Sequence, residues 1–86
     1  MTEMKIKTWI IDKAQDDARR YNIFFDVTRR TNDDINQRLV EDGCYYMKVE
    51  EVLKETEKAL QIKLSSGDVI GSYKGWTLWV PKSQIM

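Results

Sequence analysis

The fold is decided by the segment that starts at Glu55 and reads Glu55-Thr56-Glu57-Lys58-Ala59-Leu60-Gln61-Ile62-Lys63-Leu64. After a loop punctuated by glycines, the chain continues as Trp79-Val80-Pro81-Lys82-Ser83-Gln84-Ile85. Leu60, Ile62 and Leu64 alternate with polar residues, which is the period of a strand with one buried face. Pro81 cannot donate a ladder hydrogen bond, so a strand over residues 76–80 should end there or lie at an edge. The segment predicts two strands of one antiparallel sheet, followed by a short tail.

Residues 45–54 extend the β pattern toward the N-terminus. Tyr45, Met47 and Val49 alternate with residues of the opposite face, and a tight turn near Thr56 would return the chain along residues 60–64. Residues 65–68 have the composition of a second turn, after which Val69 and Ile70 should pair briefly.

The first thirty residues predict a strand, a helix and a second strand. Residues 5–11 begin with alternating side chains and are assigned to a strand. Asp12 is the expected N-cap of a short amphipathic helix with Ala14, Ala18 and Tyr21 on its apolar stripe, and Asn22 can end it. Residues 23–28 are β-branched and aromatic, as in a strand.

A second helix is predicted over residues 32–42. Thr31 and Asp34 resemble a capping box, and the carboxylates of Asp33 and Asp34 suit the positive end of the helix dipole. Ile35 and Leu39 would face a sheet, and Gly43 would stop the helix. The expected fold is therefore one small α+β domain over residues 1–86, with three to five antiparallel strands and one or two short helices. An SH3-like barrel is the second choice.

Composition narrows the classes of function. The chain has 86 residues, 14 basic and 14 acidic, with no histidine and one cysteine. Without a histidine, Cys44 lacks a partner base for nucleophilic catalysis and a conventional zinc site lacks its ligands. The glycines at 67, 71 and 75 do not match a phosphate loop, because Lys74 precedes the last glycine and a strand follows. We expect a non-enzymatic protein without a cofactor, in a reducing cytoplasm and without a membrane span or signal peptide.

Two sets of residues are candidates for contacts with a partner. The first set is acidic and could occupy a basic nucleic-acid channel as phosphates would; it comprises Asp33, Asp34, Glu50, Glu51, Glu55 and Glu57. The second set is basic and aromatic and would contact phosphates and stack on bases; it comprises Arg19, Arg20, Arg29, Arg30, Tyr73, Lys74, Trp76 and Trp79. Trp76 and Trp79 should point to opposite faces of their strand, one toward the core and the other toward solvent.

Two segments of the chain resemble the C-terminal signature of small uncharacterised proteins from phages and plasmids, mostly of Gram-positive bacteria. They are Glu55-Thr56-Glu57-Lys58-Ala59 and Trp79-Val80-Pro81-Lys82-Ser83-Gln84-Ile85. The resemblance covers about a third of the chain. It implies a mobile-element setting, in which a small protein binds and inhibits a host macromolecule such as a CRISPR nuclease or another defence protein. The alternative is an accessory protein that binds nucleic acid directly.

The C-terminal tail leaves two arrangements open. Ile85 could fold back and close the core of its own sheet, or the tail and an edge strand could be buried against a second copy in a homodimer.

Overall fold

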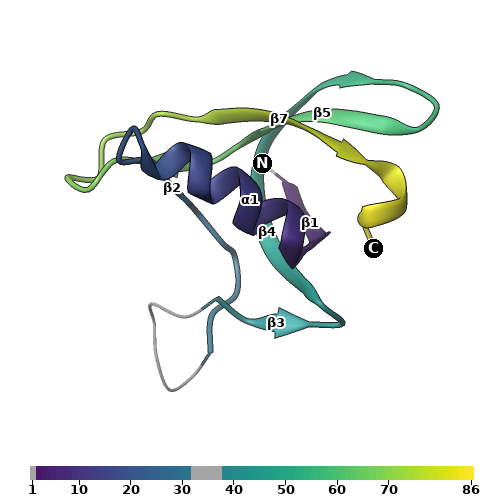
Figure 1. Ribbon diagram of the computed structural model, residues 1–86, viewed down its shortest axis with the longest axis horizontal. Helices are drawn as coiled ribbons and strands as arrows, with labels where there is room; N and C mark the ends of the chain where they lie inside the picture. The colour runs from purple at the N-terminus through teal and green to yellow at the C-terminus, as the bar shows by residue number, and fades with distance from the viewer. Residues whose placement is uncertain (1, 32–37) are drawn as a thin grey trace.

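The computed structural model describes residues 2–31 and 38–86, and its main feature is a curved antiparallel sheet crossed by one helix (Figure 1). The elements in chain order are β1 (Thr2–Lys7), α1 (Thr8–Arg19), β2 (Phe24–Phe25), β3 (Val40–Glu41), β4 (Cys44–Glu55), β5 (Ala59–Leu64), β6 (Ser66–Gly67), β7 (Trp76–Pro81) and the 3-10 helix η1 (Lys82–Gln84). The expected α+β class, with a small antiparallel sheet and a short helix, is confirmed.

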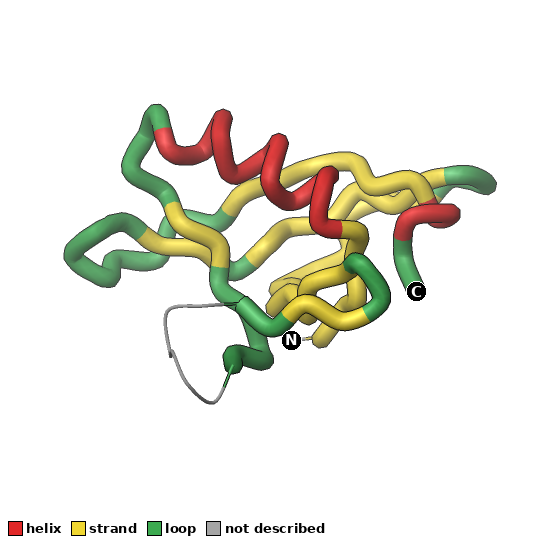
Figure 2. The backbone as a smooth tube through the Cα atoms, turned by 60° about the horizontal axis from the view of Figure 1, so that its bottom comes forward, coloured by secondary structure: helices red, strands yellow, loops and turns green. Residues whose placement is uncertain are grey.

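The main sheet has the strand order β1-β4-β5-β7, and β3 also pairs with β4. The two strands predicted from the deciding segment are β5 and β7, which pair from Ala59↔Pro81 to Leu64↔Trp76. β2 and β6 form a second, two-stranded sheet. Figure 2 shows α1 lying across the strands, with the β4–β5 hairpin extending beyond it.

The core lies between α1 and the sheet and consists of aliphatic side chains with one phenylalanine and one methionine. Its buried members are Ile6, Ile10, Ile11, Ala18, Phe25, Val27, Met47, Val49, Ile62, Leu64 and Val80. Ile85 packs against this core and bridges to Ile6 of β1, while the Met86 N–H donates to the Lys5 carbonyl at 2.8 Å. The tail therefore folds back onto its own sheet.

The first helix begins earlier than expected. The strand predicted over residues 5–11 ends at Lys7, and α1 begins at Thr8 rather than after Asp12. Trp9, Ile10 and Ile11 have good strand propensity, but a helix allows both Ile10 and Ile11 to reach the core. Tyr21 lies beyond the helix and is exposed. Asn22 adopts a left-handed φ of 58°, which suits its place just after the helix end.

The prediction of a second helix is wrong for those of its residues that the structure describes. Its residues 32–37, including Asp33, Asp34 and Ile35, lie outside the described part of the chain. The rest is extended: β3 pairs with β4 as Val40↔Tyr45 and Glu41↔Cys44. Asp42 and Gly43 have φ values of 56° and 70°. Positive φ at both residues is the requirement of a two-residue hairpin turn, so Asp-Gly here is a hairpin signal and not a helix stop.

Two further predictions are corrected in the loops. The strand expected over residues 23–28 is divided, because β2 pairs with β6 whereas Val27 bridges to Met47 of β4. Residues 65–68 were expected to turn, but Ser66–Gly67 forms β6 and the turn follows it. Val69 and Ile70 do not pair; both are strongly exposed at that turn, which the Asp68 carboxylate stabilises by accepting the Ile70 and Ser72 N–H groups.

Candidate functional site

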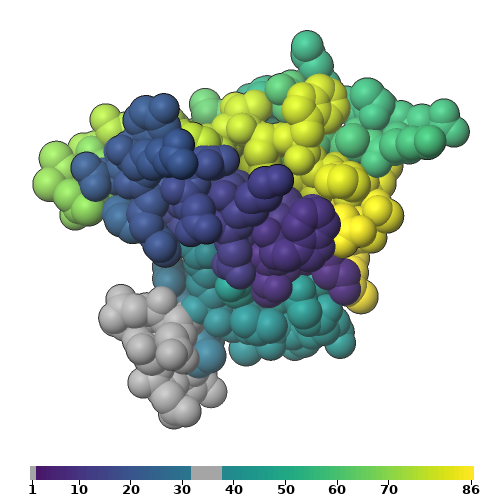
Figure 3. Space-filling view, in the orientation of Figure 1, coloured from purple at the N-terminus to yellow at the C-terminus, as the bar shows by residue number. Residues whose placement is uncertain are grey.

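The candidate site is a cleft between α1 and the edge strand β7. It has a volume of about 420 Å³ and is lined by Trp9, Ile10, Lys13, Ala14 and Asp17 from the helix and by Trp76, Thr77, Leu78, Trp79 and Pro81 from the strand. We call it the α1–β7 cleft. Figure 3 shows the helix and the C-terminal segment side by side on one face of the molecule.

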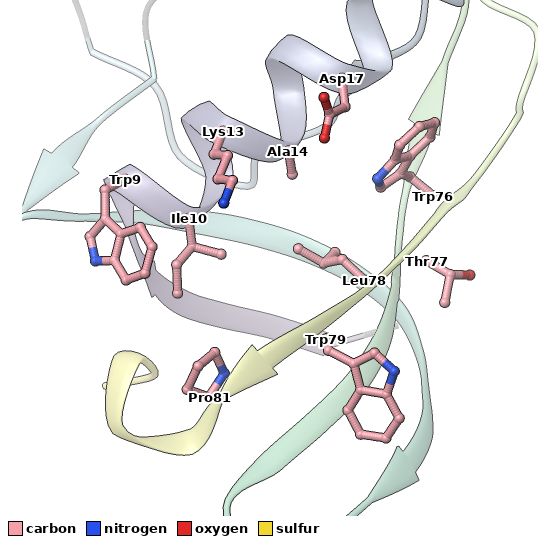
Figure 4. A pocket seen from close by; sticks show the side chains of 10 residues that line it. All are labelled: Trp9, Ile10, Lys13, Ala14, Asp17, Trp76, Thr77, Leu78, Trp79 and Pro81. Carbon is pink, nitrogen blue, oxygen red and sulfur yellow. The ribbon is translucent and has the colours of Figure 1, made fainter.

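The helix supplies one side of the cleft because its residues recur with helical spacing. Trp9, Lys13 and Asp17 are four residues apart, so they follow one another along a single face. Ile10 and Ala14 lie beside them and form the apolar floor together with Leu78 (Figure 4). The strand supplies the other side, because Trp76, Leu78 and Val80 face the core while Thr77, Trp79 and Pro81 alternate with them.

Two tryptophans flank the cleft and remain accessible. Trp9 is 58% exposed and Trp79 is 47% exposed. The Trp9 indole Nε1 donates to Oε1 of Gln84 at 3.3 Å, which fixes the ring beside η1. Figure 4 shows the Trp79 indole pointing away from the helix, on the opposite face of β7 from Leu78. Large aromatic side chains at a surface are typical of binding hot spots.

Trp76 has a different role from Trp79. It is half-buried, and its ring lies 6.1 Å from that of Tyr21 and 6.2 Å from that of Phe25, measured between centroids. Trp76 and Trp79 therefore occupy opposite faces of β7, with Trp76 packed against the core and Trp79 directed toward solvent. Trp76 is engaged within the protein, so its ring is not a free stacking surface.

The acidic candidates are interleaved with lysines. Glu50, Glu51 and Glu55 lie on β4, and Glu57 lies in the turn that joins β4 to β5. Glu51 is opposite Lys63 in the strand register, and Glu55 accepts a hydrogen bond from Lys82 Nζ at 2.6 Å. Of these four carboxylates, Glu55 is the one that forms an ion pair among the described residues. Among the described residues, no three histidine, cysteine or carboxylate side chains gather as metal ligands would.

The four arginines of the two doublets have different environments. Arg19 ends α1 and Arg20 caps it, and both are exposed. Arg29 pairs with Glu3 at 3.2 Å, and its guanidinium lies 4.1 Å from the centroid of the Tyr46 ring. Arg30 forms a main-chain bridge with Arg38.

Arg38 is a basic residue that the sequence did not single out. Its Nη2 donates to Oε1 of Gln15 at 2.9 Å. Burial lowers the pKa of its guanidinium, and the positive charges of Arg30 and Arg19 lower it further. Tyr45 and Asp12 act in the opposite direction, so acidic and basic groups both surround Arg38.

The remaining candidates lie near the loop before β7. Tyr73 is exposed, with Lys63 Nζ 5.5 Å from its ring centroid, and Lys74 pairs with Asp68 at 3.8 Å. Trp9, Lys13 and Asp17 are not among the predicted site residues. A helix that follows Asp12 leaves Trp9 in a strand, so the face that the three residues share is missing from the prediction. A helix that starts at Thr8 would have shown their i, i+4, i+8 spacing.

Comparison of the chain with protein families, with curated proteins and with solved structures finds no match. No helix among the described residues is long and apolar enough to cross a membrane.

Proposed function

We propose that this protein is a non-catalytic binding protein that docks onto a protein of its host through the α1–β7 cleft and thereby inhibits it. The observation that supports the proposal is an apolar-floored cleft bordered by two exposed tryptophans, Trp9 on the helix and Trp79 on the outer face of β7. Buried aromatic anchors contribute most of the energy of many protein interfaces. The resemblance of the two C-terminal segments to mobile-element proteins supports a partner from the host. We propose that this partner is a CRISPR nuclease or another defence protein.

The cleft is a better candidate for the partner-binding surface than the acidic residues that the sequence predicted. Glu55 forms an ion pair with Lys82, so its charge is partly neutralised within the protein. Exposed carboxylates with nearby lysines contribute little binding energy once salt screens them.

The test is affinity capture from a lysate of the bacterial host, followed by mass spectrometry. The full chain should retain a protein partner, and Trp9→Ala combined with Trp79→Ala should lose most of it. Ile70→Ala is the matched control, since it removes an apolar side chain that is 83% exposed but lies outside the cleft. Retention of nucleic acid without any protein, or equal capture by the double variant, would reject the proposal.

A direct nucleic-acid binder is the second candidate, and the exposure of Arg19, Arg20 and Arg30 favours it. Arg19→Glu with Arg30→Glu should then abolish binding to single-stranded DNA or RNA. Glu50→Lys with Glu51→Lys should leave it intact or improve it.

A salt titration decides whether phosphate contacts carry such binding. The logarithm of affinity should fall with the logarithm of salt by roughly 0.7 for each phosphate neutralised on a single strand. Tryptophan fluorescence that is unchanged by DNA and RNA at low salt would remove this candidate.

A further inference from the structure

β7 is an edge strand whose outer hydrogen-bonding groups face solvent. It ends the strand order β1-β4-β5-β7 and pairs only with β5 among the strands of the described residues. The Lys82 N–H donates to the Lys58 carbonyl at 2.8 Å, and the Lys74 N–H donates to the Ser66 carbonyl at 2.8 Å. Backbone groups alternate in direction along an antiparallel strand. The even-numbered residues of β7 therefore bond toward β5, and the N–H and C=O groups of Thr77 and Trp79 point outward.

This open ladder lies beside the α1–β7 cleft. The helix runs antiparallel to β7, so Trp9 and Lys13 lie toward the Pro81 end and Asp17 lies toward the Trp76 end (Figure 4). A strand added to β7 would place alternate side chains on the helix side. The side chain opposite Leu78 would then meet the apolar floor formed by Ile10 and Ala14.

Lys13 and Asp17 on the helix give the cleft opposite charges at different positions along its length. Both Lys13 and Asp17 line it, with Asp17 nearer to Trp76 and Lys13 nearer to Pro81 (Figure 4). Neither forms an ion pair within 4.0 Å among the described residues. A side chain opposite Val80 would meet Lys13, and one opposite Trp76 would meet Asp17. Complementary charges at these positions are a carboxylate near Lys13 and a cation near Asp17.

We propose that the α1–β7 cleft binds an extended segment of the partner protein as an additional antiparallel strand on β7, with the pattern acidic–x–apolar–x–basic from its N-terminus to its C-terminus. An antiparallel segment passes Lys13 first and Asp17 last, which sets the order of the charges. Strand addition to an exposed edge is a general mode of peptide recognition, in which the ladder provides affinity and alternate side chains provide specificity. This inference rests on the proposed function and names the chemistry of the partner.

A second copy of the chain fits the cleft less well than such a segment. If two β7 strands paired about Leu78, Val80 and Trp76 of the partner copy would lie opposite Trp76 and Val80, respectively. Neither residue is charged, so Lys13 and Asp17 would face uncharged side chains of that strand. Pro81 also has no N–H, which limits the ladder between two copies.

The experiment is a titration of the ¹⁵N-labelled full chain with the capped peptide Ser-Asp-Thr-Ile-Thr-Lys-Ser, followed by amide NMR spectra. The amide signals of Thr77 and Trp79 should shift together and become protected from hydrogen exchange, because these two N–H groups gain acceptors. The charge-swapped peptide Ser-Lys-Thr-Ile-Thr-Asp-Ser should bind about 5-fold more weakly at low salt, and the difference should shrink as salt rises.

Two variants at one position isolate the ladder. Thr77→Pro removes an outward donor at an edge strand, where proline is tolerated, and should abolish binding. Thr77→Ala keeps the N–H and should bind the peptide within about 2-fold of the wild type. The wild-type spectra are decisive by themselves if Thr77→Pro does not fold.

Three results would overturn the inference. One is the absence of shifts at Thr77 and Trp79 with the peptide at about 1 mM, a concentration at which even weak complexes form. Another is a set of shifts confined to α1. The third is concentration-dependent change at β7 without peptide, which would indicate a second copy as the occupant. Capture of a host protein that depends on Trp9 and Trp79 but not on the Thr77 N–H would leave the proposed function standing while this inference fails.

Discussion

The side-chain amide of Gln15 replaces a strand neighbour for Phe25. Its Oε1 accepts the Phe25 N–H at 3.0 Å, and its Nε2 donates to the Ile23 carbonyl at 2.7 Å. Gln15 is 3% exposed and belongs to α1, so this one polar residue of the buried helix face ties the helix to β2. Both polar atoms of the amide are satisfied, as buried polar groups usually are.

Replacement of Gln15 should therefore destabilise the protein. Gln15→Leu would leave the Phe25 N–H and the Ile23 carbonyl without their partner and should cost about 1–3 kcal/mol of unfolding free energy. Urea unfolding followed by circular dichroism measures this. Asp16→Leu is the neighbouring control on the exposed face, where its pair with Arg19 at 3.9 Å is worth little. Equal loss in both variants would contradict the role of the amide.

Substitutions of Gly43, in the turn between β3 and β4, should change the stability of the protein through backbone conformation alone. Its φ is +70°, and a Cβ placed there meets no atom within 4 Å. Gly43→Ala should cost about 1–2 kcal/mol, because a Cβ disfavours the left-handed region. Gly43→Asn should cost less, since asparagine tolerates that region. Thermal unfolding of the two variants gives the order, and similar stability of alanine and glycine at this position would show that the turn has another conformation.

The Lys5–Asp42 contact should make the stability of this region depend on pH. The hydrogen bond from Lys5 lowers the pKa of the Asp42 carboxyl below 3.8, and the same bond raises the pKa of the Lys5 ammonium above 10.5. A carboxyl whose pKa is lower in the folded state stabilises it above the unfolded value. This contribution is lost as the pH falls through the folded value, whereas the contribution of Lys5 is lost only as the pH rises above 10.5.

Asp42→Asn is the variant that tests this dependence. The wild type should have the higher urea midpoint at neutral pH, and the difference should shrink near pH 2.5, roughly a unit below the ordinary pKa of an aspartate. Because both side chains reach solvent, the difference should also shrink as salt is added. A gap that stays constant from neutral pH to acid would exclude the ion pair as its cause.

The tail should be required for stability rather than for association. A chain that ends at Pro81 loses the packing of Ile85 and the bond from the Met86 N–H to the Lys5 carbonyl. We expect it to be less stable by about 1–3 kcal/mol, which corresponds to burial of one aliphatic side chain. Met86→Ala is the control, since Met86 is exposed and its N–H is kept.

Light scattering at two concentrations tests whether the chain associates. A homodimer stays a prediction, but the observed fold-back removes the tail from the surface that was expected to form it. A truncated chain as stable as the full one would show that Ile85 contributes nothing to the core. A dimer that disappears on truncation would instead assign the tail to an interface.

The sequence by itself determined the local β pairing of the C-terminal half. Alternation over residues 45–64 and the proline at 81 predicted β4, β5 and an edge strand, because these signals depend on neighbours along the chain. The same local signals failed at Thr8–Ile11 and at Asp42–Gly43. There β-branched residues form a helix and a glycine turns a hairpin, since burial against the sheet and pairing with β4 outweigh propensity.

Only the tertiary structure decided the α1–β7 cleft. Trp9 and Trp79 are seventy positions apart in the numbering, and no spacing along the chain relates them. They come to border one cleft because burial of Ile10 and Ile11 holds α1 against the sheet, while pairing with β5 leaves β7 at its edge. A cleft between a helix and an open strand edge results from that packing, so no local sequence pattern could have predicted it.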